Sequence, residues 1–573
     1  MLNFYDFEVF KYDWLVVIAN LYEQTETVIV NDKEKLEAYY EAHKNEIWIG
    51  YNNQHYDQFI AKGIMCGFDP REINDFIIVE NKQGWQYSSL FRKIPMYNFD
   101  VMYRNDRGLK SLEGFMGNNI KETSVDFNID RKLTQAEIEE TIKYCRHDVE
   151  QTIEVFFQRK DDFDAQMGLI KMFNLPLSNI SRSKAQLSAT ILDAKRPAHS
   201  RNDEFDISFP DTLKVEKYTH VLDWYNNPEN RDYSKSLTTE IAGVETIFGW
   251  GGIHSARKQY FGEGYFINMD VASLYPSLMI RYNLHSRNIK DPQKFIDIYH
   301  NRLKYKAEKN PLQLPLKTLL NSTYGTFKDK NNQLYDPLMA NNICIFGQLL
   351  LLDLIEKLED HCEIIQSNTD GILIKLRRHD DYDLIDDIVY EWEKRTGLQM
   401  EFDEYRKVFQ KDVNNYIVVP SGPLYDENGK PRWKSKGSYV KKQNPLDYDL
   451  PIVNKAMIEF MINNVPIEKT IGECDDLIMF QKIVKLSGKF KFAIHNNKIL
   501  NEKCFRVFAS NDSSDSYIGK QKDVNRTIEQ FANTPEHCYI DNEDVKNKKV
   551  DSRLNKDWYI DMTKKRLKQF GVI

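Results

Sequence analysis

An aspartate stands at the end of an apolar run and directly before a turn that contains proline. The run YFINM precedes Asp270, and the residues DVASLYPS carry the chain through the turn and past Pro276. The apolar run predicts a buried strand, and a tight turn after it fixes the carboxylate beside a pocket. A carboxylate fixed in this way can bind a divalent metal ion. Asp270 is therefore a candidate for metal-dependent chemistry.

The N-terminal part of the chain holds a second set of acids. FYDFEVF alternates as a short strand does, so Asp6 and Glu8 are expected on one face of that strand. The apolar run IWIGYNN leads into Asn53 and Asp57. Two acids on one strand face can share a divalent metal ion, although a solvent-facing edge strand is the alternative for Asp6 and Glu8 alone.

A further acid is expected on a helix. Thr134 and Glu137 have the spacing of a capping box, which predicts that a helix begins there. Tyr144 lies one helical turn before Asp148, so both side chains point to the same side.

In chain order, these acids with Asn53 and Tyr144 resemble the Asp-Glu-Asp-Asp exonucleases of the tyrosine type. In the histidine type, the residue that orients water lies five positions before the last Asp, where this chain has Lys143. The resemblance implies hydrolysis of a 3′-terminal phosphodiester with two Mg²⁺ or Mn²⁺ ions, Tyr144 orienting the water. SLEGF resembles a motif that contacts single-stranded DNA in proofreading domains, which implies that Ser111 and Leu112 bind DNA, and the exonuclease resemblance implies the same for Asn53. The implied metal ligands are Asp6, Glu8, Asp57 and Asp148.

The string DVASLYPS resembles the first catalytic motif of the family B DNA polymerases. The resemblance implies nucleotidyl transfer from a dNTP to a primer paired with template DNA, again with two Mg²⁺ or Mn²⁺ ions at the site. Asp270 and the Val271 carbonyl are the implied metal ligands here. Ser273, Leu274 and Tyr275 would contact the nucleotide, the Tyr275 ring excluding a ribose 2′-hydroxyl.

Two helices are expected to present cations. The segment DPQKFIDIYHNRLKYKAEK begins with an Asp cap and a first-turn Pro, and its Arg302 and Lys306 share one face. In LKTLLNSTYGTF, Lys317, Asn321 and Tyr324 also align, and this segment resembles the Lys-x3-Asn-Ser-x-Tyr-Gly motif of family B. Cations on two helices can clamp a triphosphate, and the resemblance places Tyr324 by the nascent base pair. A solvated face is the alternative for the first helix.

A second acid of the same site is expected at a turn. EIIQSNTDGILIKL predicts two strands joined by a turn that carries Asp370, and a buried helix from about Pro337 to Asp360 is expected before it. The pair resembles the Asp-Thr-Asp-Ser hairpin of family B, but Asn368 replaces the first Asp and Gly371 replaces the Ser. An amide does not supply the charge of a carboxylate, so Asp270 and Asp370 are left to bridge both metal ions.

Two more segments imply DNA contacts by resemblance. FGWGGIHSA resembles the Tyr-x-Gly-Gly segment that joins exonuclease and polymerase, and KSKG resembles the palm element that grips primer-terminus DNA. Adjacent glycines let a DNA backbone approach closely, although a turn between strands is the alternative. The expected Lys-x-Tyr before KSKG reads Asn-Asn-Tyr at 414–416, which weakens the expected primer contact. The implied DNA-binding residues are Trp250, Gly251, Gly252, Lys434, Lys436 and Gly437.

Composition limits the class of protein. A chain of 573 residues, 41% of them hydrophobic, is expected to be globular and to contain several domains. The net charge of −8 argues against a uniformly basic DNA-coating protein, so basic runs such as 430–442 must act locally. Seven scattered cysteines without a CxxC pair indicate reduced thiols and no zinc or iron–sulfur site. Without a leader or an uninterrupted run of about eighteen apolar residues, a cytoplasmic protein without a membrane segment is expected.

The resemblance implies an α/β multidomain fold, in which a ribonuclease H-like exonuclease domain precedes a right-hand polymerase with palm, fingers and thumb. The expected boundaries are 1–165 for the exonuclease, 166–247 for a connecting segment and the start of the palm, 248–290 and 328–445 for the palm, 291–327 for the fingers and 446–573 for the thumb.

The intervals between the polymerase motifs do not fit the insertions of protein-primed replicases. We therefore expect a monomeric replicase of a bacteriophage or mobile element, acting in the bacterial host cytoplasm with processivity, helicase or single-strand-binding partners. Three alternatives stay open: an exonuclease with an impaired polymerase site, a divergent protein-primed replicase, and a non-catalytic DNA-binding replication factor.

Overall fold

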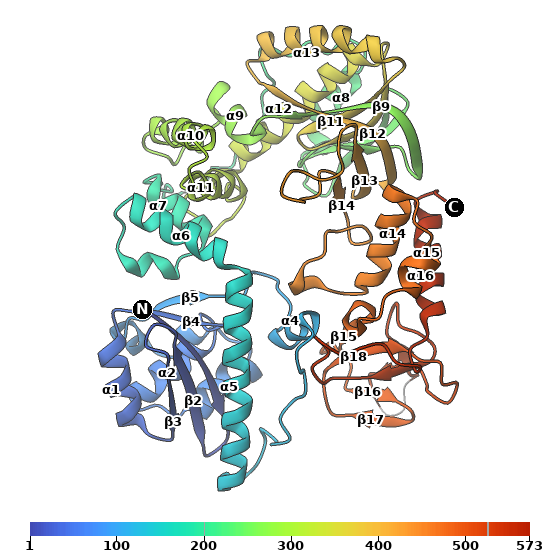
Figure 1. Cartoon of the computed structure of the whole chain (residues 1–573). Helices are drawn as coiled ribbons and strands as arrows, with labels where there is room; N and C mark the ends of the chain where they lie inside the picture. The colour runs from blue at the N-terminus through green and yellow to red at the C-terminus, as the bar shows by residue number, and fades with distance from the viewer. Residues whose placement is uncertain (200, 524–526) are drawn as a thin grey trace. The chain divides into compact units, whose positions relative to one another are not determined.

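The computed structural model covers the whole chain and describes residues 1–199, 201–523 and 527–573. These residues form two compact units, each made of helices and sheets (Figure 1). The prediction of an α/β multidomain chain is therefore confirmed. Unit 1 comprises Met1–Ser183, Gln443–Pro451 and Cys474–Tyr559, and unit 2 comprises Lys184–Lys442, Ile452–Glu473 and Ile560–Ile573.

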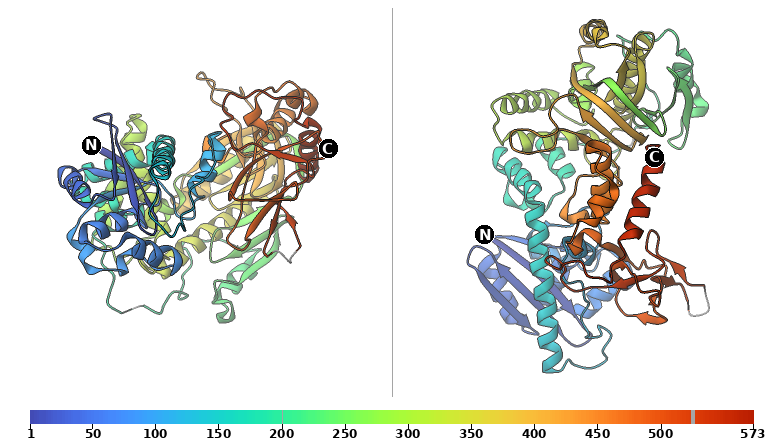
Figure 2. Two further views of the ribbon diagram at one scale, coloured as in Figure 1. Left: turned by 90° about the horizontal axis from the view of Figure 1, so that it is seen from below. Right: turned by 45° about the vertical axis from the view of Figure 1, so that its right-hand side comes forward.

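Unit 1 is built on a five-stranded mixed sheet with the strand order β3-β2-β1-β4-β5 (Figure 2). The central strand β1 runs antiparallel to β2 and parallel to β4. The strands are β1 (Leu2–Val9), β2 (Trp14–Asn20), β3 (Thr25–Val30), β4 (Ile47–Gly50) and β5 (Tyr97–Asp100). The helices of this part are α1 (Lys33–His43), α2 (Asp57–Cys66), α3 (Pro70–Asn74), α4 (Leu109–Met116), α5 (Gln135–Gln158) and α6 (Lys160–Met172).

The side chains of β1 alternate between the two faces of the sheet, as a period of two predicts. Phe7 belongs to a core cluster that also contains side chains of α1 and α2. Phe4 instead packs edge-to-face on Phe156 of α5, with ring centroids 5.2 Å apart. Asp6 and Glu8 follow Phe4 at steps of two, so the strand directs both acids toward α5.

Helix α5 begins where the sequence predicts. The Thr134 hydroxyl accepts a bond from the Glu137 amide, and the Glu137 carboxylate accepts one from the Thr134 amide at 2.8 Å, which completes the capping box. The helix packs along β1 and β2 in all views (Figures 1 and 2). Residues 144–148 of α5 therefore lie next to the acids of β1.

The late segment 474–559 belongs to unit 1, which differs from the predicted thumb of 446–573. A fully buried arginine of this segment, Arg506, gives the physical reason. Its guanidinium group donates to the carbonyls of Gly114 at 3.2 Å, Asn118 at 2.7 Å and Asp541 at 3.2 Å, and so joins α4 to the late segment. The segment forms two small sheets, β15-β18-β21 and β17-β16-β19-β20. Their strands are β15 (Lys482–Lys485), β16 (Phe492–His495), β17 (Lys498–Leu500), β18 (Cys504–Ala509), β19 (Gly519–Gln521), β20 (Glu529–Gln530) and β21 (Cys538–Ile540).

Unit 2 is built on a nine-stranded sheet with the order β14-β13-β12-β9-β11-β10-β8-β7-β6, in which neighbouring strands are antiparallel. Strand β9 lies between β11 and β12, and Asp270 stands at its end, as predicted. The strands are β6 (Ser236–Ile241), β7 (Val244–Gly249), β8 (His254–Ala256), β9 (Tyr260–Val271), β10 (Glu363–Asn368), β11 (Gly371–Leu376), β12 (Met400–Asp412), β13 (Asn415–Pro420) and β14 (Lys434–Lys436).

The turn after Asp270 differs from the predicted Pro-containing turn. Ser273 adopts the left-handed backbone conformation with φ 51°, and α9 (Leu274–Arg281) begins directly after it, so Pro276 lies in the first turn of a helix. Next along the chain, α10 (Pro292–Ala307) and α11 (Gln313–Gly325) pack side by side (Figure 1). Asp291 caps α10, as predicted. Five further helices are α7 (Lys184–Ile191), α8 (Thr219–Asn226), α14 (Pro451–Asn463), α15 (Ile467–Gly472) and α16 (Lys556–Gln569).

Helix α12 (Pro337–Leu358) is the buried helix that the sequence predicts. It is long and apolar enough to span a membrane, but 94% of its most apolar window is buried inside the structure, as in a core helix. Asp353 interrupts its apolar run and is itself fully buried. It pairs with Arg395 of α13 (Tyr382–Thr396) through two bonds of 2.8 Å, which explains an acid in an otherwise apolar helix.

Replacing Asp353 with Ala should destabilise unit 2 by about 3 kcal/mol, because Arg395 would lose its only buried counter-charge among the described residues. The midpoint of urea unfolding, followed by intrinsic tryptophan fluorescence, to which the buried Trp392 contributes, measures the change. Asp360→Ala is the matched control, since Asp360 is exposed just after the same helix. Equal shifts for the two variants would contradict the assigned role of the pair.

Candidate active sites

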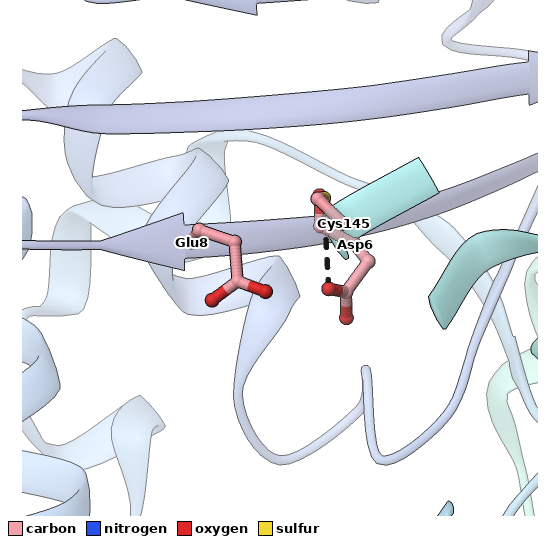
Figure 3. A group of neighbouring side chains, drawn as sticks. All are labelled: Asp6, Glu8 and Cys145. Carbon is pink, nitrogen blue, oxygen red and sulfur yellow. Dashed lines mark hydrogen bonds between the residues drawn. The ribbon is translucent and has the colours of Figure 1, made fainter. Parts of the chain in front are cut away.

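The first acid cluster lies in unit 1 between β1 and α5. Asp6, Glu8 and Cys145 each offer one ligand atom, and these atoms lie within 4.8 Å of one another (Figure 3). The Cys145 thiol donates to the Asp6 backbone carbonyl at 3.3 Å and lies 3.7 Å from the Asp6 carboxylate. The two acids therefore occupy one face of β1, as the alternation of the sequence predicts.

The other two predicted acids border this pair. The Phe7 amide, between the two acids of β1, donates to Asp57 Oδ1 at 3.1 Å, and Asp57 is 2% exposed at the start of α2. On α5, Asp148 follows Tyr144 by one turn and accepts a bond from Lys110 Nζ at 2.7 Å. The structure thus brings the four predicted acids together and adds a lysine that sequence reasoning missed.

Lys110 lies among the acids and beside the tyrosine predicted to orient water. Its ammonium group contacts Glu113 Oε2 at 3.1 Å and lies 4.7 Å from the centre of the Tyr144 ring. In this structure the Tyr144 hydroxyl donates to Glu122 Oε2 at 3.4 Å, and it would have to leave this acceptor to donate to water. Burial and the nearby carboxylates raise the pKa of Tyr144 far above its ordinary value. The phenol therefore keeps its proton and can donate it in a hydrogen bond to water.

Burial raises the pKa of each acid in the cluster, and for Asp6 and Glu8 repulsion by the other acids of the cluster adds to that rise. The pKa values of Asp6 and Glu8 both lie well above their ordinary range. Burial raises the pKa of Asp57 to about 7 and that of Asp148 to about 6, although Lys110 opposes the second shift. The raised pKa values indicate that the single positive charge of Lys110 does not balance the acids of the cluster.

The donor set fits a hard divalent cation. Carboxylate oxygens from one strand and two helices are the ligands that Mg²⁺ and Mn²⁺ prefer. The Cys145 thiol does not fit this set, because burial raises the pKa of the thiol well above its ordinary value and keeps it protonated. The residues that could hold the ions are Asp6, Glu8, Asp57 and Asp148.

Three residues predicted to contact single-stranded DNA are buried. Ser111 and Leu112 of α4 are 4% and 2% exposed, and Asn53 is fully buried. The Asn53 amide donates to Asn98 Oδ1 at 3.3 Å, while the Asn53 amide oxygen has no partner among the described residues. These side chains fix α4 and the loop before α2 in this structure, and their contact with DNA stays a prediction.

The second site lies at the end of β9 in unit 2. Strand β11 pairs Gly371 with Asp270, and the Val271 amide donates to the Asp370 carbonyl at 2.7 Å, so the turn that carries Asp370 lies against Asp270. Asn268 donates to Asp270 Oδ2 at 2.7 Å. Burial raises the pKa of Asp270, the bond from Asn268 opposes that rise, and the nearby charge of Asp370 adds to it.

One departure from the hairpin motif has a steric reason. A Cβ atom at Gly371 would lie 2.0 Å from Asp270 Oδ1 and 2.8 Å from the Met269 carbonyl. The glycine therefore leaves the space that the Asp270 carboxylate occupies. The oxygens of Asp270, Asp370 and the Val271 carbonyl are a hard donor set that fits Mg²⁺ or Mn²⁺, with one acid fewer than the family motif.

Helix α10 contacts both flanks of this site. Arg302 Nη1 donates to Ser273 Oγ at 3.0 Å, three residues after Asp270, and Lys306 Nζ lies 3.6 Å from Glu401 Oε1. Glu401 is the residue that β12 pairs with Asp270. Sequence reasoning missed Glu401 because no pattern along the chain reveals which residues face each other across strands.

The other five predicted nucleotide residues fall into three groups. Tyr275 and Tyr324 stack with ring centroids 3.9 Å apart, and the Tyr324 hydroxyl lies 2.7 Å from Cys344 Sγ. Leu274 is buried in the core, whereas Lys317 and Asn321 are exposed on α11. The exposed pair is accessible to a solute, and the stacked tyrosines form one wall beside the Asp270 turn.

The glycine-rich segment before β8 is packed more closely than expected. The Trp250 ring is 6% exposed and lies in an aromatic cluster with Tyr225 and Tyr233, so its side chain is not free to contact DNA. A Cβ atom at Gly252 would lie 2.6 Å from Thr369 Oγ1 in the turn before Asp370, whereas one at Gly251 would meet nothing within 4 Å. Gly252 therefore permits close packing on the hairpin, which favours the structural alternative for this residue.

The KSKG element forms the edge of the nine-stranded sheet. Lys434 is exposed and pairs with Asp403, and Lys436 stands opposite Tyr416 of β13. Gly437 has φ 99°, and a Cβ atom there would lie 2.4 Å from the Asn414 carbonyl, so a close approach to the β12–β13 turn requires glycine. A role of these residues in DNA binding stays a prediction.

Comparison with known proteins gives a partial likeness to DNA polymerases. No protein-family model matches the chain. DNA polymerase 1 of Aeropyrum pernix is 24% identical over 231 residues, a match that covers 33% of this chain and 23% of the polymerase. The match thus spans less than a quarter of that curated relative. The structure of the family B DNA polymerase from the hyperthermophilic archaeon Pyrobaculum calidifontis aligns with a TM-score of 0.42 and 14% identity, over 99% of this chain and 77% of that one.

The raised pKa values of the first cluster predict opposite effects of pH and Mg²⁺. Without metal, the folded protein holds protons that the unfolded chain releases above about pH 4, so the free energy of unfolding should fall as pH rises toward the pKa of Asp57, about 7. Mg²⁺ requires the ionised acids, so it should raise the melting temperature more at pH 8 than at pH 5.5.

Thermal melts with and without Mg²⁺ at the two pH values measure this difference. Asp57→Asn should reduce the Mg²⁺ effect at pH 8, whereas Asp161→Asn, at an exposed position of α6, should leave it unchanged. Equal Mg²⁺ shifts at both pH values would rule out a metal site at these acids.

Proposed function

We propose that the chain is a primer-dependent DNA polymerase of family B with a 3′→5′ proofreading exonuclease. The observation that carries the proposal is the strand pairing that sets Asp270 beside the Asp370 turn, with Arg302 bonded to Ser273 next to them. The partial similarity to DNA polymerase 1 of A. pernix agrees with this assignment. The substrates are dNTPs and primer–template DNA.

In the polymerase site, the side chains bind and orient the nucleotide. Two Mg²⁺ or Mn²⁺ ions, when bound, supply the Lewis acidity for attack of the primer 3′-oxygen on the α-phosphorus. The cations of α10 and α11 neutralise the charge of the triphosphate. Arg302 is placed for this role because its guanidinium group already contacts the turn after Asp270. The Tyr275 ring limits the space at the sugar. The proposed metal ligands are Asp270, Asp370 and the Val271 carbonyl, and the proposed triphosphate cations are Arg302, Lys306 and Lys317.

In the exonuclease site, the chain holds a water against a 3′-terminal phosphodiester. The four acids of unit 1 would hold ions of the same kind, which would supply Lewis acidity to the attacking water. Tyr144 donates a hydrogen bond to that water, because its pKa keeps the phenol protonated. Lys110 places a positive charge 2.7 Å from Asp148, where it limits the repulsion among the acids before metal binds.

The finer parts of the assignment follow from the polymerase family. We propose that unit 1 contains a ribonuclease H-like exonuclease domain and that unit 2 supplies the palm and fingers. The interval from Asp270 to Lys317 is filled by α9, α10 and the start of α11, and that from Lys317 to Asp370 mainly by α12. This supports a compact replicase of a phage or mobile element that extends an ordinary primer in the host cytoplasm, as a monomer aided by helicase, processivity or single-strand-binding partners.

One observation favours a second candidate, an exonuclease whose polymerase site is impaired. Asn368 stands where the family motif has an acid, so fewer negative charges face the metal ions. A protein of this kind would shorten a primer but would not extend it.

A labelled DNA primer on a longer template tests both candidates, because extension and shortening are read in one assay. Asp370→Asn should slow extension by about 100-fold or more and leave degradation intact, and Asp148→Asn should do the reverse. Asp383→Asn, an exposed acid of α13, is the control. Degradation by the wild-type protein with no extension in the presence of dNTPs and Mg²⁺ would support the impaired polymerase instead.

Gly371→Ala should slow extension by at least about tenfold, because the added methyl group would overlap Asp270 Oδ1 and push this carboxylate out of place. Degradation by unit 1 should not change. Gly488→Ala is the control, since a Cβ atom there would meet nothing within 4 Å. Normal extension by Gly371→Ala would show that the position of the Asp270 carboxylate is not critical.

A further inference from the structure

One concave surface of unit 2 contains none of the residues proposed above for metal, nucleotide or DNA binding. The segment before α8, the C-terminal end of α12 and helix α13 line a hollow of about 730 Å³. Hollows of roughly 300–1,000 Å³ are the size that small-molecule ligands occupy in proteins. The proposed polymerase chemistry gives this hollow no role, so its side chains need a separate explanation.

The elements around the hollow hold one another in place. Arg395 of α13 binds Asp353 of α12 through two bonds of 2.8 Å and also donates to the Thr212 carbonyl in the segment before α8. The Trp392 indole is 2% exposed and donates to the Leu350 carbonyl of α12 at 3.0 Å. The hollow is therefore preformed, and the charge of Arg395 is already balanced by Asp353.

Cations without counter-charges line the hollow. Within the described residues, the side chains of Lys214, His361 and Lys394 have no hydrogen-bond or ion-pair partner. Lys357 lies 3.3 Å from Glu356, whose carboxylate also accepts bonds from backbone amides of the segment before α8. Ammonium groups form strong, charge-assisted hydrogen bonds with phosphate. Unpaired cations gathered in a hollow, in a chain whose net charge is −8, indicate an anionic ligand.

Two acids on α13 narrow the choice of anion. Asp387 and Glu391 line the same hollow, and their spacing of four places both side chains on one face of the helix. Both are exposed and have no partner within the part of the chain that the structure describes. Carboxylates repel a bare phosphate but accept hydrogen bonds from hydroxyl and amino groups. The ligand is therefore expected to combine several negative charges with such donors.

We propose that this hollow binds a nucleoside triphosphate, at a site separate from the proposed polymerase site. The phosphate chain carries the negative charge that Lys214, Lys357 and Lys394 can neutralise. The ribose hydroxyls and the amino group of a base are the donors that Asp387 and Glu391 can accept. Ile388, between the two acids, and the aliphatic stems of the lysines give apolar contact for the base. The site does not depend on the polymerase assignment.

The test uses the full chain with Lys306→Gln and Lys317→Gln as parent, which removes two cations proposed for the polymerase triphosphate. ATP binding without DNA is measured by isothermal titration calorimetry. Adding Lys214→Gln and Lys394→Gln should weaken ATP binding by about tenfold or more, because two charge-assisted bonds to phosphate are lost. Lys290→Gln with Lys330→Gln, at exposed positions elsewhere in unit 2, is the matched control and should change the affinity by less than about twofold.

Tripolyphosphate and adenosine, titrated separately, show which part of ATP is recognised. Each should bind the parent at least about tenfold more weakly than ATP, since each lacks the partners of one set of side chains. Asp387→Asn with Glu391→Gln should remove the preference for ATP over tripolyphosphate. The reason is that these acids accept the hydrogen bonds that only the nucleoside offers.

Three results would overturn the proposal: no ATP binding by the parent, equal affinity for ATP and tripolyphosphate, or binding that Lys214→Gln and Lys394→Gln leave unchanged. Because Lys214 and Lys394 are exposed, their variant should melt with its parent in the absence of ATP. ATP should then raise the melting temperature of the parent alone, which separates a lost site from lost folding. Primer extension by the wild-type protein tests the polymerase assignment independently, so the two proposals can fail separately.

Discussion

Two like charges about 4 Å apart near a protein surface repel each other by about 4 kcal/mol, and both candidate sites hold carboxylates at close quarters. In unit 1 Lys110 lies against Asp148 and offsets part of this repulsion, while burial and the neighbouring carboxylates raise the pKa of Asp6 and of Glu8. In unit 2 an amide, Asn268, bonds to Asp270 and adds no charge. Each site is left with a deficit of positive charge, which a divalent ion from solution can fill. Nearby helices also supply cations: α4 carries Lys110 at the first site, and α10 carries Arg302 and Lys306 at the second.

In unit 2, the register of the strand pairing fixes the position of Asp270. Met269 and Val271, on either side of Asp270, are buried in the core, so a slip of one residue would bury the acid and expose two apolar side chains. The pairing with β11 and β12 thus fixes Asp270, and the small residues Gly252 and Gly371 let the neighbouring hairpin pack against it. The position of the Asp270 carboxylate therefore depends on the packing of its buried apolar neighbours and of the adjacent hairpin.

Local sequence patterns predicted many residues of each site. They did not predict contacts between residues that lie far apart in the sequence. The period of two placed Asp6 and Glu8 on one face, and the capping box placed the start of α5. The same period of two places Asn268, two residues before Asp270, on the same face of β9, so its contact with Asp270 could have been predicted. Lys110 and Glu401 carried no such signal, because each meets its partner only through tertiary packing. The same reason explains why Trp250 is buried and why residues 474–559 join unit 1: both depend on contacts between segments far apart in sequence.

The buried Arg506 ties the completion of unit 1 to the order of protein synthesis. Its bonds to the carbonyls of Gly114 and Asn118 hold α4, the helix that carries Lys110, yet Arg506 lies in the last part of the chain. A chain leaves the ribosome with its N-terminus first, so the acids of unit 1 emerge long before the residues that fix α4 beside them. The acid cluster of unit 1 therefore reaches its final arrangement late, after most of unit 2 has been made. A nascent or truncated chain carries the acids of unit 1 and α4 without the arginine that fixes this helix in place.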